Sequence, residues 1–499
     1  MSEHVELRRG TYSDSVSLMQ VSRAVHDAPG VTAALVAMAT ELNLDLLATT
    51  GLTAPDGAGP NDLLVAVRAD DDEALAGALA TLDAALAALT ARSTPAGGLG
   101  AAAPSRTTGS AARRSGGDLA LVSVPGRFAF VEAMDALQAG LHVVLFSDNV
   151  PLAQEVRLKD EAARRGLLLM GPDCGTAVVG GVGLGFANVV QQGRVGLVAA
   201  SGTGAQQLMC LLDAAGVGIS ACLGVGGRDL SREVAARSTR QALAALDADP
   251  GTDVVVLVSK PPAPEVAEQV RALVAGLGTP VRLALLGEGA DDLTTVAEAV
   301  VSHLGLPVPT WPVWAPERAP IAGGGALRGL FSGGTLCDEA MVLAAAELGP
   351  VHSNIPLRPE WALPADLRAT GHAMVDFGDD RLTAGRPHPM IDPTLRLERL
   401  AVEAADPSVG VVLLDVVLGH AADPDPAGRL APAVRAALDG ARADGRELAV
   451  VVSLCGTSAD PQGRDRTAEA LRGAGATVLL SNAAAARLAV ELARPGAAA

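Results

Sequence analysis

Aromatic residues are scarce in this chain: they make up only 2% of its 499 residues. Hydrophobic residues nevertheless account for 49%, and most of them are Ala, Val and Leu. An aliphatic core of this kind is typical of parallel sheets that are covered by helices on both faces. The length allows about three or four domains. The composition therefore favours an α/β protein of several domains.

Cysteine, basic charge and long apolar runs are also limited. The five cysteines include no C-x-x-C pair, which argues against a zinc site and against a disulfide framework. The net charge of −18 and the lack of a basic patch argue against a nucleic-acid partner. The chain has no apolar leader and no uninterrupted apolar run of about 18 residues, so we expect a cytoplasmic protein without a membrane partner.

One short sequence pattern occurs twice in the chain. An apolar run over 195–200 ends in a Ser-Gly-Thr turn, and one over 327–331 ends in a Ser-Gly-Gly-Thr turn; a helical stretch follows each. Strand, small-residue turn and helix together aim free backbone N–H groups and a helix dipole at an anion. The repeat predicts two phosphate or carboxylate cradles, at Ser201, Gly202 and Thr203, and at Ser332, Gly333, Gly334 and Thr335.

The similarity continues beyond these turns. A Gly-rich turn with an arginine follows each helical stretch, and a second apolar run follows each turn, over 253–258 and over 411–417. A recurrence of order and spacing over this length predicts two related α/β domains. Further candidate anion-binding residues are Gly226, Gly227, Arg228, Gly378 and Arg386, although arginines in polar loops are often ordinary surface residues.

Domain boundaries follow from the alternation of apolar runs and loop-forming segments. In the N-terminal part we expect a helix over 31–42, a strand over 62–68 and a helix over 72–89. The segment 93–117 is rich in Gly, Ala, Ser, Pro and Arg and predicts a flexible linker. The expected divisions are a small α/β module (1–92), the linker (93–117), a βαβ domain (118–192) and the two repeat domains (193–308 and 323–499).

Three residues are candidates for catalysis. His388 lies between two prolines and is the first candidate for an acid, a base or a phosphate donor. His420 ends a strand, where a histidine either takes part directly or caps the strand. Cys174 is a nucleophile if its thiolate faces a helix dipole, and otherwise a small residue that fills a turn. Mg²⁺ is a further candidate, because Asp415, Asp423 and Asp425 cluster near a strand end.

The order of motifs resembles a known superfamily. Ser-Val-Pro (123–125), Gly-Pro-Asp-Cys (171–174), Val-Ala-Ala-Ser-Gly-Thr (198–203) and Gly-Val-Gly-Gly (224–227) follow one another as in the succinyl-CoA synthetase α-subunit superfamily. The segments 7–16, 332–339 and 385–393 resemble its FdrA branch more closely. The resemblance implies a Rossmann-like CoA-binding-type domain followed by two flavodoxin-like CoA-ligase-type domains. The candidate cofactor-binding positions are Pro125, Gly171, Pro172 and Asp173, in turns at the carboxyl ends of the expected parallel strands, and the resemblance implies CoA as the ligand.

The chain also departs from that superfamily. No histidine follows the turn at 455–464, where the resemblance would place the phosphorylated residue. No ATP-grasp region or Walker A motif is present, so ATP would have to come through a partner subunit. We expect partner subunits and an oligomer.

Three functions remain open at this point. The first is an FdrA-type acyl-CoA synthetase-like subunit that handles an acyl group, phosphate and CoA. The second is a subunit of an oxamate carbamoyltransferase, which exchanges a carbamoyl group between oxalurate and phosphate in allantoin catabolism. The third is a non-catalytic subunit that senses acyl-CoA or acts as a scaffold.

Overall fold

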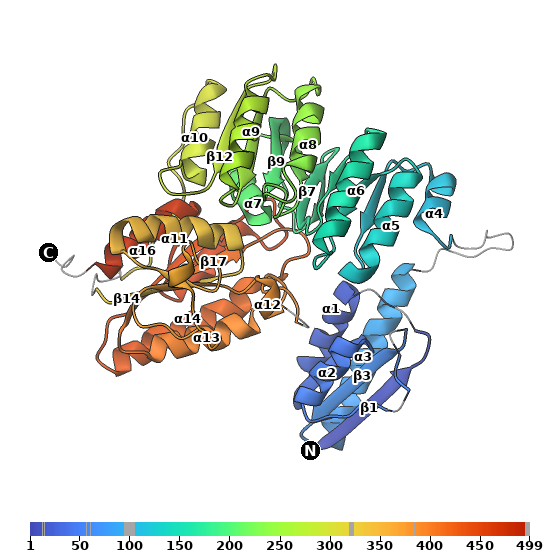
Figure 1. Ribbon diagram of the computed structural model, residues 1–499. Coiled ribbons are helices and arrows are strands. Elements are labelled where there is room, and N and C mark those ends of the chain that lie inside the picture. The colour runs from blue at the N-terminus through green and yellow to red at the C-terminus, as the bar shows by residue number, and fades with distance from the viewer. Residues whose placement is uncertain are drawn as a thin grey trace. The chain divides into compact units, whose positions relative to one another are not determined.

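The computed structural model describes residues 1–11, 13, 15–55, 57–59, 61–93, 105–318, 324–383 and 386–494 (Figure 1). The described residues form two compact units: those within 1–104 and 384–387 form one, and the other described residues form the second. No helix among the described residues is both long and apolar enough to cross a membrane.

The N-terminal module is a three-stranded antiparallel sheet with helices. Its strands lie in the order β1-β3-β2, and Leu63, Val65 and Val67 of the central strand are fully buried. The predicted strand over 62–68 and helix over 72–89 are confirmed. The elements are β1 (Ser2–Arg8), α1 (Ser15–His26), β2 (Val31–Met38), α2 (Glu41–Thr49), β3 (Leu63–Ala69) and α3 (Asp72–Ser93).

The prediction of a helix over 31–42 is wrong. Residues 31–38 form β2, which pairs antiparallel with β3 along its length. Four of these eight residues are Ala or Leu, both good helix formers. Pairing with the buried strand β3 overrides that local preference, because strand formation depends strongly on tertiary context.

A small parallel sheet, β4-β5-β6, forms the Rossmann-like domain. Part of the segment that we expected to be a flexible linker is helical here: Thr107 and Ser110 form a capping box at the start of α4. Residues 94–104 of that segment lie outside the described residues. The elements are α4 (Thr108–Ser115), β4 (Leu119–Val122), α5 (Gly126–Gln138), β5 (His142–Leu145), α6 (Leu152–Arg165) and β6 (Leu169–Met170).

The first lobe, residues 176–303, has the strand order β12-β11-β9-β10-β7-β8. The hairpin of β7 and β8 belongs to this sheet, because β7 pairs antiparallel with β10. We had placed it in the preceding domain. The elements are β7 (Thr176–Val179), β8 (Val182–Gly185), β9 (Gln192–Ala200), α7 (Gly202–Ala214), β10 (Ile219–Gly224), α8 (Arg237–Asp247), β11 (Val254–Ser259), α9 (Pro264–Val274), β12 (Val281–Leu285) and α10 (Leu293–His303).

The second lobe, residues 313–494, has the strand order β13-β19-β18-β17-β14-β16-β15. Its elements are β13 (Val313–Trp314), β14 (Ala326–Phe331), α11 (Gly334–Leu348), β15 (His352–Ser353), the short helix η1 (Pro359–Trp361), β16 (Ala373–Asp376), α12 (Asp380–Thr383), α13 (Thr394–Ala405), β17 (Val409–Val417), α14 (Pro426–Ala443), β18 (Ala449–Cys455), α15 (Arg464–Gly473), β19 (Thr477–Leu479) and α16 (Asn482–Ala493).

The two lobes share one topology. Reading β10-β9-β11-β12 in the first and β16-β14-β17-β18 in the second gives the same order of parallel strands, 2-1-3-4, which is flavodoxin-like. The predicted duplication and fold class are therefore confirmed. In such sheets ligands bind outside the carboxyl ends of the strands, at the point where the strand order reverses. That point lies after β9 and β11 in the first lobe, and after β14 and β17 in the second.

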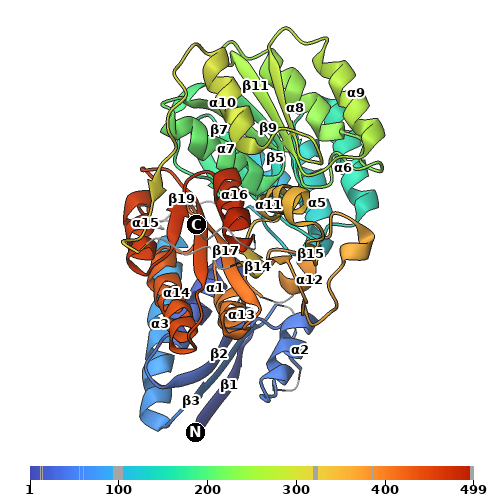
Figure 2. The same cartoon turned by 90° about the vertical axis from the view of Figure 1, so that its left-hand side faces the viewer.

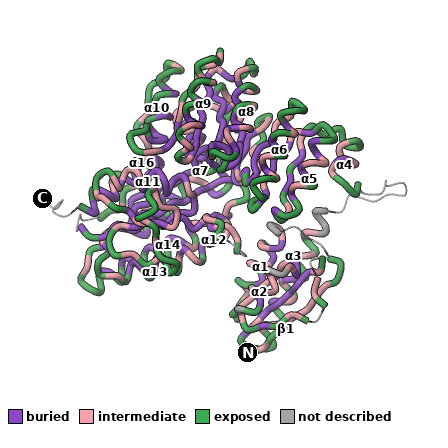
Figure 3. The backbone as a smooth tube through the Cα atoms, in the orientation of Figure 1, coloured by how far each residue is buried: buried purple, intermediate pink, exposed green. Residues whose placement is uncertain are grey.

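The lobes meet through a continuous apolar core. Helices α7 and α10 contact α11 and α16, and these helices lie together in both views of the molecule (Figures 1 and 2). Buried residues run through both sheets and across this junction (Figure 3). A core shared in this way holds the carboxyl ends of the two sheets in a defined relation.

Glu339 of α11 is a buried carboxylate within the junction. It accepts hydrogen bonds from the backbone N–H of Leu293 at 2.7 Å and from the side-chain amide of Asn482 at 2.7 Å. Burial raises the pKa of Glu339 to about 7. The folded state thus binds this proton more readily than the unfolded state, so stability falls as pH rises from about 4.5 to about 7.

Replacing Glu339 by glutamine is expected to remove the decrease in stability at high pH. The free energies of unfolding of Glu339→Gln and the wild type should nearly agree at pH 5. At pH 8 the variant should be more stable by about 2 kcal/mol, because no charge is buried. Urea unfolding at both pH values measures the difference. Glu398→Gln, at an exposed position of α13, is the control and should show no such pH-dependent gap; equal gaps in both variants would contradict the prediction.

Candidate functional site

The starts of α7 and α11 touch each other. The hydroxyl oxygens of Ser201 and Thr335 are 2.6 Å apart, and a Cβ on Gly333 would lie 2.6 Å from Cγ2 of Thr203. Both helices follow the carboxyl ends of strands, α7 after β9 and α11 after β14. Gly202 is exposed and Gly334 is partly exposed, so solvent reaches the first turn of both helices. The structure thus brings the two predicted cradles to one place.

The two helices begin in different ways. Ser201 caps α7 by accepting a hydrogen bond from the backbone N–H of Gly204 at 2.9 Å. No side chain caps α11 at its N-cap residue Gly333. Instead Asp415 of β17 accepts hydrogen bonds from the backbone N–H groups of Ser332, at 2.7 Å, and Gly333, at 2.9 Å. Asp415 therefore fixes the turn that leads into α11.

Asp415 is itself held by a buried arginine. Nη1 of Arg396 donates to the Asp415 carboxylate at 2.7 Å, and Nη2 donates to its backbone carbonyl at 2.9 Å. Burial raises the pKa of Asp415, and the Arg396 charge opposes that shift. Both carboxylate oxygens of Asp415 are already engaged, and the described residues contain no group of side chains arranged to hold a metal ion. Asp415 is thus a structural partner of the turn.

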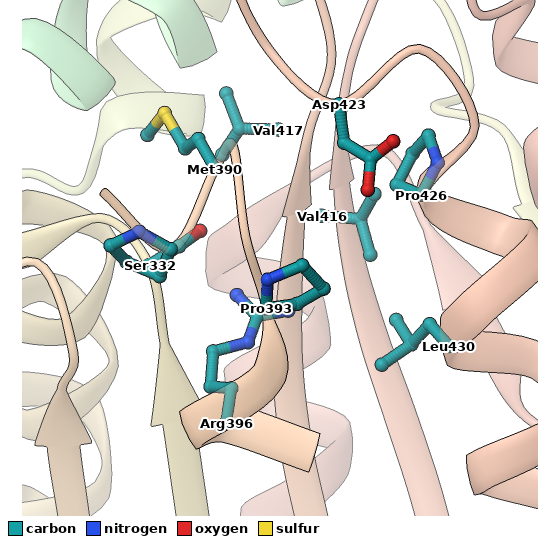
Figure 4. Close-up of a pocket in the computed structure, with 10 residues that line it drawn as sticks. Ser332, Met390, Pro393, Arg396, Val416, Val417, Asp423, Pro426 and Leu430 are labelled. Atoms are coloured by element: carbon teal, nitrogen blue, oxygen red, sulfur yellow. The ribbon is translucent and has the colours of Figure 1, made fainter. Parts of the chain in front are cut away.

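A small pocket lies beside this turn (Figure 4). Ser332 and Arg396 line it together with Met390, Val416 and Leu430. The Nε atom of Arg396 is buried and has no hydrogen-bond partner among the described residues. The lining of the pocket is mostly apolar, and Arg396 and Asp423 are its charged residues.

Charged side chains gather at the start of α11. A Cβ on Gly334 would lie 2.7 Å from Oδ2 of Asp376 and 3.0 Å from Nζ of Lys260, so these two groups are neighbours. Asp338 lies one turn further along α11, and both aspartates are buried. Burial raises the pKa of Asp376 to about 7 and that of Asp338 to about 6, while the Lys260 charge opposes both shifts.

His388 reaches the same region through Gly378. A Cβ on Gly378 would lie 2.8 Å from the carbonyl oxygen of Ser332, 2.9 Å from Nε2 of His388 and 3.1 Å from Oδ1 of Asp376. Burial, together with the Arg396 charge, lowers the pKa of His388 to about 4. Its Nδ1 accepts a hydrogen bond from the backbone N–H of Met390 at 3.3 Å, which places the single proton of the neutral ring on Nε2. His388 is therefore a hydrogen-bond donor at neutral pH.

The Gly-Pro-Asp-Cys turn after β6 packs directly on the loop after β10. A Cβ on Gly226 would lie 2.4 Å from the carbonyl oxygen of Pro172, and one on Gly224 would lie 2.6 Å from Sγ of Cys174. Burial raises the pKa of Cys174 to about 12, so it remains a thiol at neutral pH. A protonated thiol is a poor nucleophile, and this argues against the catalytic role that we considered for Cys174.

The other predicted residues lie at exposed positions or in strand-end turns. Arg228 is exposed; it donates to the carbonyl oxygen of Val150 and forms an ion pair with the Glu155 carboxylate, both at 2.8 Å. His420 and Arg386 are exposed. The remaining predicted positions lie in strand-end turns: Pro125 precedes α5, Gly171 follows β6, Gly227 follows β10, and Asp173 is exposed in the turn after β6.

Comparison with known proteins places the chain in a family. Residues 1–102 match the family model "AllF, heavy metal-associated domain", and residues 330–492 match "CoA-ligase". The uncharacterized protein YahF of Escherichia coli K12 is 38% identical over 507 residues, which cover 97% of each chain. The chain belongs to the FdrA-like family that includes YahF. The resemblance predicted from the sequence motifs is thereby confirmed.

More distant relatives cover part of the chain. The succinate–CoA ligase [ADP-forming] α subunit of Methanothermobacter thermautotrophicus is 29% identical over 28% of this chain and 47% of that protein. The match between this FdrA-like chain and that relative therefore spans about half the length of the relative. Among solved structures, the dinucleotide-forming acetyl-coenzyme A synthetase 1 of Ca. Korarchaeum cryptofilum is similar over 75% of this chain and 84% of that chain, at 16% identity and a TM-score of 0.28. The carbamoyltransferase and sensor alternatives gain no support from these relatives.

The metal implied by the name of the first family model does not fit the N-terminal module. Residues 1–102 contain no cysteine, the usual ligand of soft metal ions. In the part of the module that the structure describes, no three His, Cys, Asp or Glu side chains are arranged to hold a metal ion.

Proposed function

We propose that this FdrA-like protein transfers a small acyl group between phosphate and a second acceptor, with an acyl phosphate as one of the reacting species. The observation that carries this proposal is the contact between the starts of α7 and α11, through Ser201 and Thr335 at 2.6 Å. The relationship to CoA ligases supports CoA as the second acceptor.

The helix starts suit a phosphate group for a physical reason. The first amides of a helix have no partner within it, and the helix dipole adds about half a positive charge there. Two helix N-termini that meet at one point together provide about twice this partial positive charge. Ser201 and Asp415 each occupy some of the available amides, and the amides at the exposed first turns remain for a ligand.

His388 supplies a donor for the acyl group. As the acyl carbonyl is attacked, its oxygen becomes negatively charged and is stabilised by a fixed hydrogen-bond donor. The Nε2 proton of His388 serves as that donor, close to the turn at Ser332. In this proposal the CoA thiol attacks the acyl carbon of an acyl phosphate, and inorganic phosphate leaves with the thiol proton; in the reverse direction phosphate attacks an acyl-CoA and the thiol leaves. No phosphorylated histidine is needed.

The cofactor proposal concerns the Rossmann-like domain. Its three strands are parallel, so the turns at Pro125 and at Gly171, Pro172 and Asp173 lie at one edge of the sheet. We assign CoA to these turns. ATP would reach the site only through a partner subunit, and phosphate and a small acyl substrate complete the set of ligands.

Isotope exchange tests the proposed reaction. The protein is incubated with ³²P-labelled inorganic phosphate and a panel of acyl phosphates, with and without CoA and the products of neighbouring genes. Label should enter the acyl phosphate, because the reaction is reversible at the acyl carbon. Absence of exchange with every acyl phosphate under all these conditions would refute the proposed function.

The role of His388 gives a sharper prediction. His388→Asn should lower the exchange rate at least tenfold, because the donor at Nε2 is lost. In the wild type the rate should show no ionisation of His388 above pH 5, since its pKa is about 4. His303→Asn, at the exposed end of α10, is the matched control. A loss in His420→Asn that equals the loss in His388→Asn would instead favour His420.

A further inference from the structure

Lysine is almost absent from this chain. Of its 38 basic residues only two, Lys159 and Lys260, are lysines, and all the others are arginines. Arginine therefore serves nearly every surface and ion-pair position. At Lys159 and Lys260 the chain carries a compact ammonium group, which differs from a planar guanidinium in shape and in hydrogen bonding.

Lys159 has an evident structural role. Its ammonium is fully buried and pairs with Glu155 at 2.9 Å and Asp229 at 2.7 Å, and it donates to the carbonyl oxygen of Val225 at 3.0 Å. All three of its hydrogens thus have partners, which is how a buried charge is normally compensated.

Lys260 differs from Lys159 in this respect. Its ammonium makes no hydrogen bond and no ion pair with any residue that the structure describes. Burial alone would lower the pKa of Lys260, but the nearby charges of Asp338 and Asp376 outweigh this and raise the pKa. The group is therefore positively charged and has three unused donors.

The position of Lys260 points to a ligand. It follows β11 at the point where the strand order of the first lobe reverses, and its Nζ lies beside Gly334 at the start of α11 in the second lobe. A cation next to the positive end of a helix is unfavourable by itself, whereas an anion between the two is attracted by both.

We propose that Lys260 is the phosphate-binding residue of the site, and that it holds the phosphate group of inorganic phosphate or of an acyl phosphate against the first turn of α11. This inference rests on the proposed acyl transfer and names the group that binds one of its substrates. A structural role of the kind that Lys159 has would involve an ion pair with Asp376 or Asp338, as Lys159 pairs with Glu155 and Asp229. No such ion pair is present.

The scarcity of lysine makes a direct test possible. Protein grown with [ε-¹³C]lysine gives NMR signals from two side chains only, and Lys260→Arg assigns them. Titration with inorganic phosphate should shift the Lys260 signal in a saturable way and leave the Lys159 signal in place. A Lys260 signal that does not respond to phosphate at any concentration would overturn the inference.

Calorimetry with a variant pair completes the test. Lys260→Met should weaken phosphate binding at least tenfold while leaving the melting temperature close to that of the wild type. Lys159→Met, which leaves Glu155 and Asp229 without their partner, should lower the melting temperature strongly. A strongly lowered melting temperature in Lys260→Met, with the Lys260 signal unmoved by phosphate, would establish the structural role instead. Phosphate binding at Lys260 without isotope exchange would refute the proposed reaction and leave this site in place.

Discussion

Gly334→Ala is expected to reduce the rate of acyl-phosphate exchange at least a hundredfold, with little effect on folding. The added Cβ would lie 2.7 Å from Oδ2 of Asp376 and 3.0 Å from Nζ of Lys260. Both atoms are the far ends of side chains, so they move aside at small cost to stability. Their displacement, however, changes the charged groups at the start of α11, where we place the phosphate.

A matched glycine separates this effect from a general one. Gly440 lies in α14, and a Cβ there would meet no atom within 4 Å. Gly440→Ala should retain the wild-type exchange rate and raise the free energy of unfolding by about 0.5–1 kcal/mol, because alanine is the better helix former. Exchange rates and urea unfolding are measured for both variants. Full activity in Gly334→Ala would contradict the placement of the site.

The architecture of the lobes could be predicted because its signals are local. Strands β9 and β14 are apolar runs that end in similar small-residue turns, and the repeat of this pattern predicted two related α/β domains. Residues 31–38 show where local signals fail: their alanines suit a helix, and only pairing with β3 makes them a strand. The hairpin of β7 and β8 was assigned to the wrong domain for a related reason, since its partner β10 lies later in the chain.

The site was predictable only in part. The turns at Ser201 and Ser332 have a recognisable pattern, and the structure brings them together. Asp338, Asp376 and Lys260 were not among the site residues expected from the sequence. Their proximity arises from packing between separate sheets and cannot be inferred from their spacing in the chain. The only signal in the sequence that singles out Lys260 is the near absence of other lysines.

Burial explains the remaining differences. Cys174 was considered as a nucleophile, but burial raises the pKa of its thiol and keeps it protonated. His388 was considered as an acid, a base or a phosphate donor. Its low pKa and its hydrogen bond from Met390 leave it a neutral donor. For both Cys174 and His388 the residue type suggested a catalytic role, and the burial of the side chain determined its protonation state.

Asp415→Asn is expected to destabilise the second lobe by about 3–5 kcal/mol, the usual cost of removing one partner from a buried ion pair. Asp415 is fully buried, and Arg396 is only 5% exposed, so the arginine charge would remain without compensation. The asparagine side chain also has one acceptor oxygen in place of two, which leaves donors at Ser332 or Gly333 without a partner. Urea unfolding, followed by circular dichroism, measures the change.

The control for this prediction is an ion pair on the surface of the same lobe. Asp439 pairs with Arg442 at 2.9 Å on α14, and both side chains are exposed. Asp439→Asn should change the free energy of unfolding by no more than about 0.5 kcal/mol, because solvent screens exposed pairs. If Asp415→Asn were as mild as this control, the turn before α11 would not depend on Asp415. The same variant should also slow acyl-phosphate exchange, since the start of α11 would lose the group that fixes it.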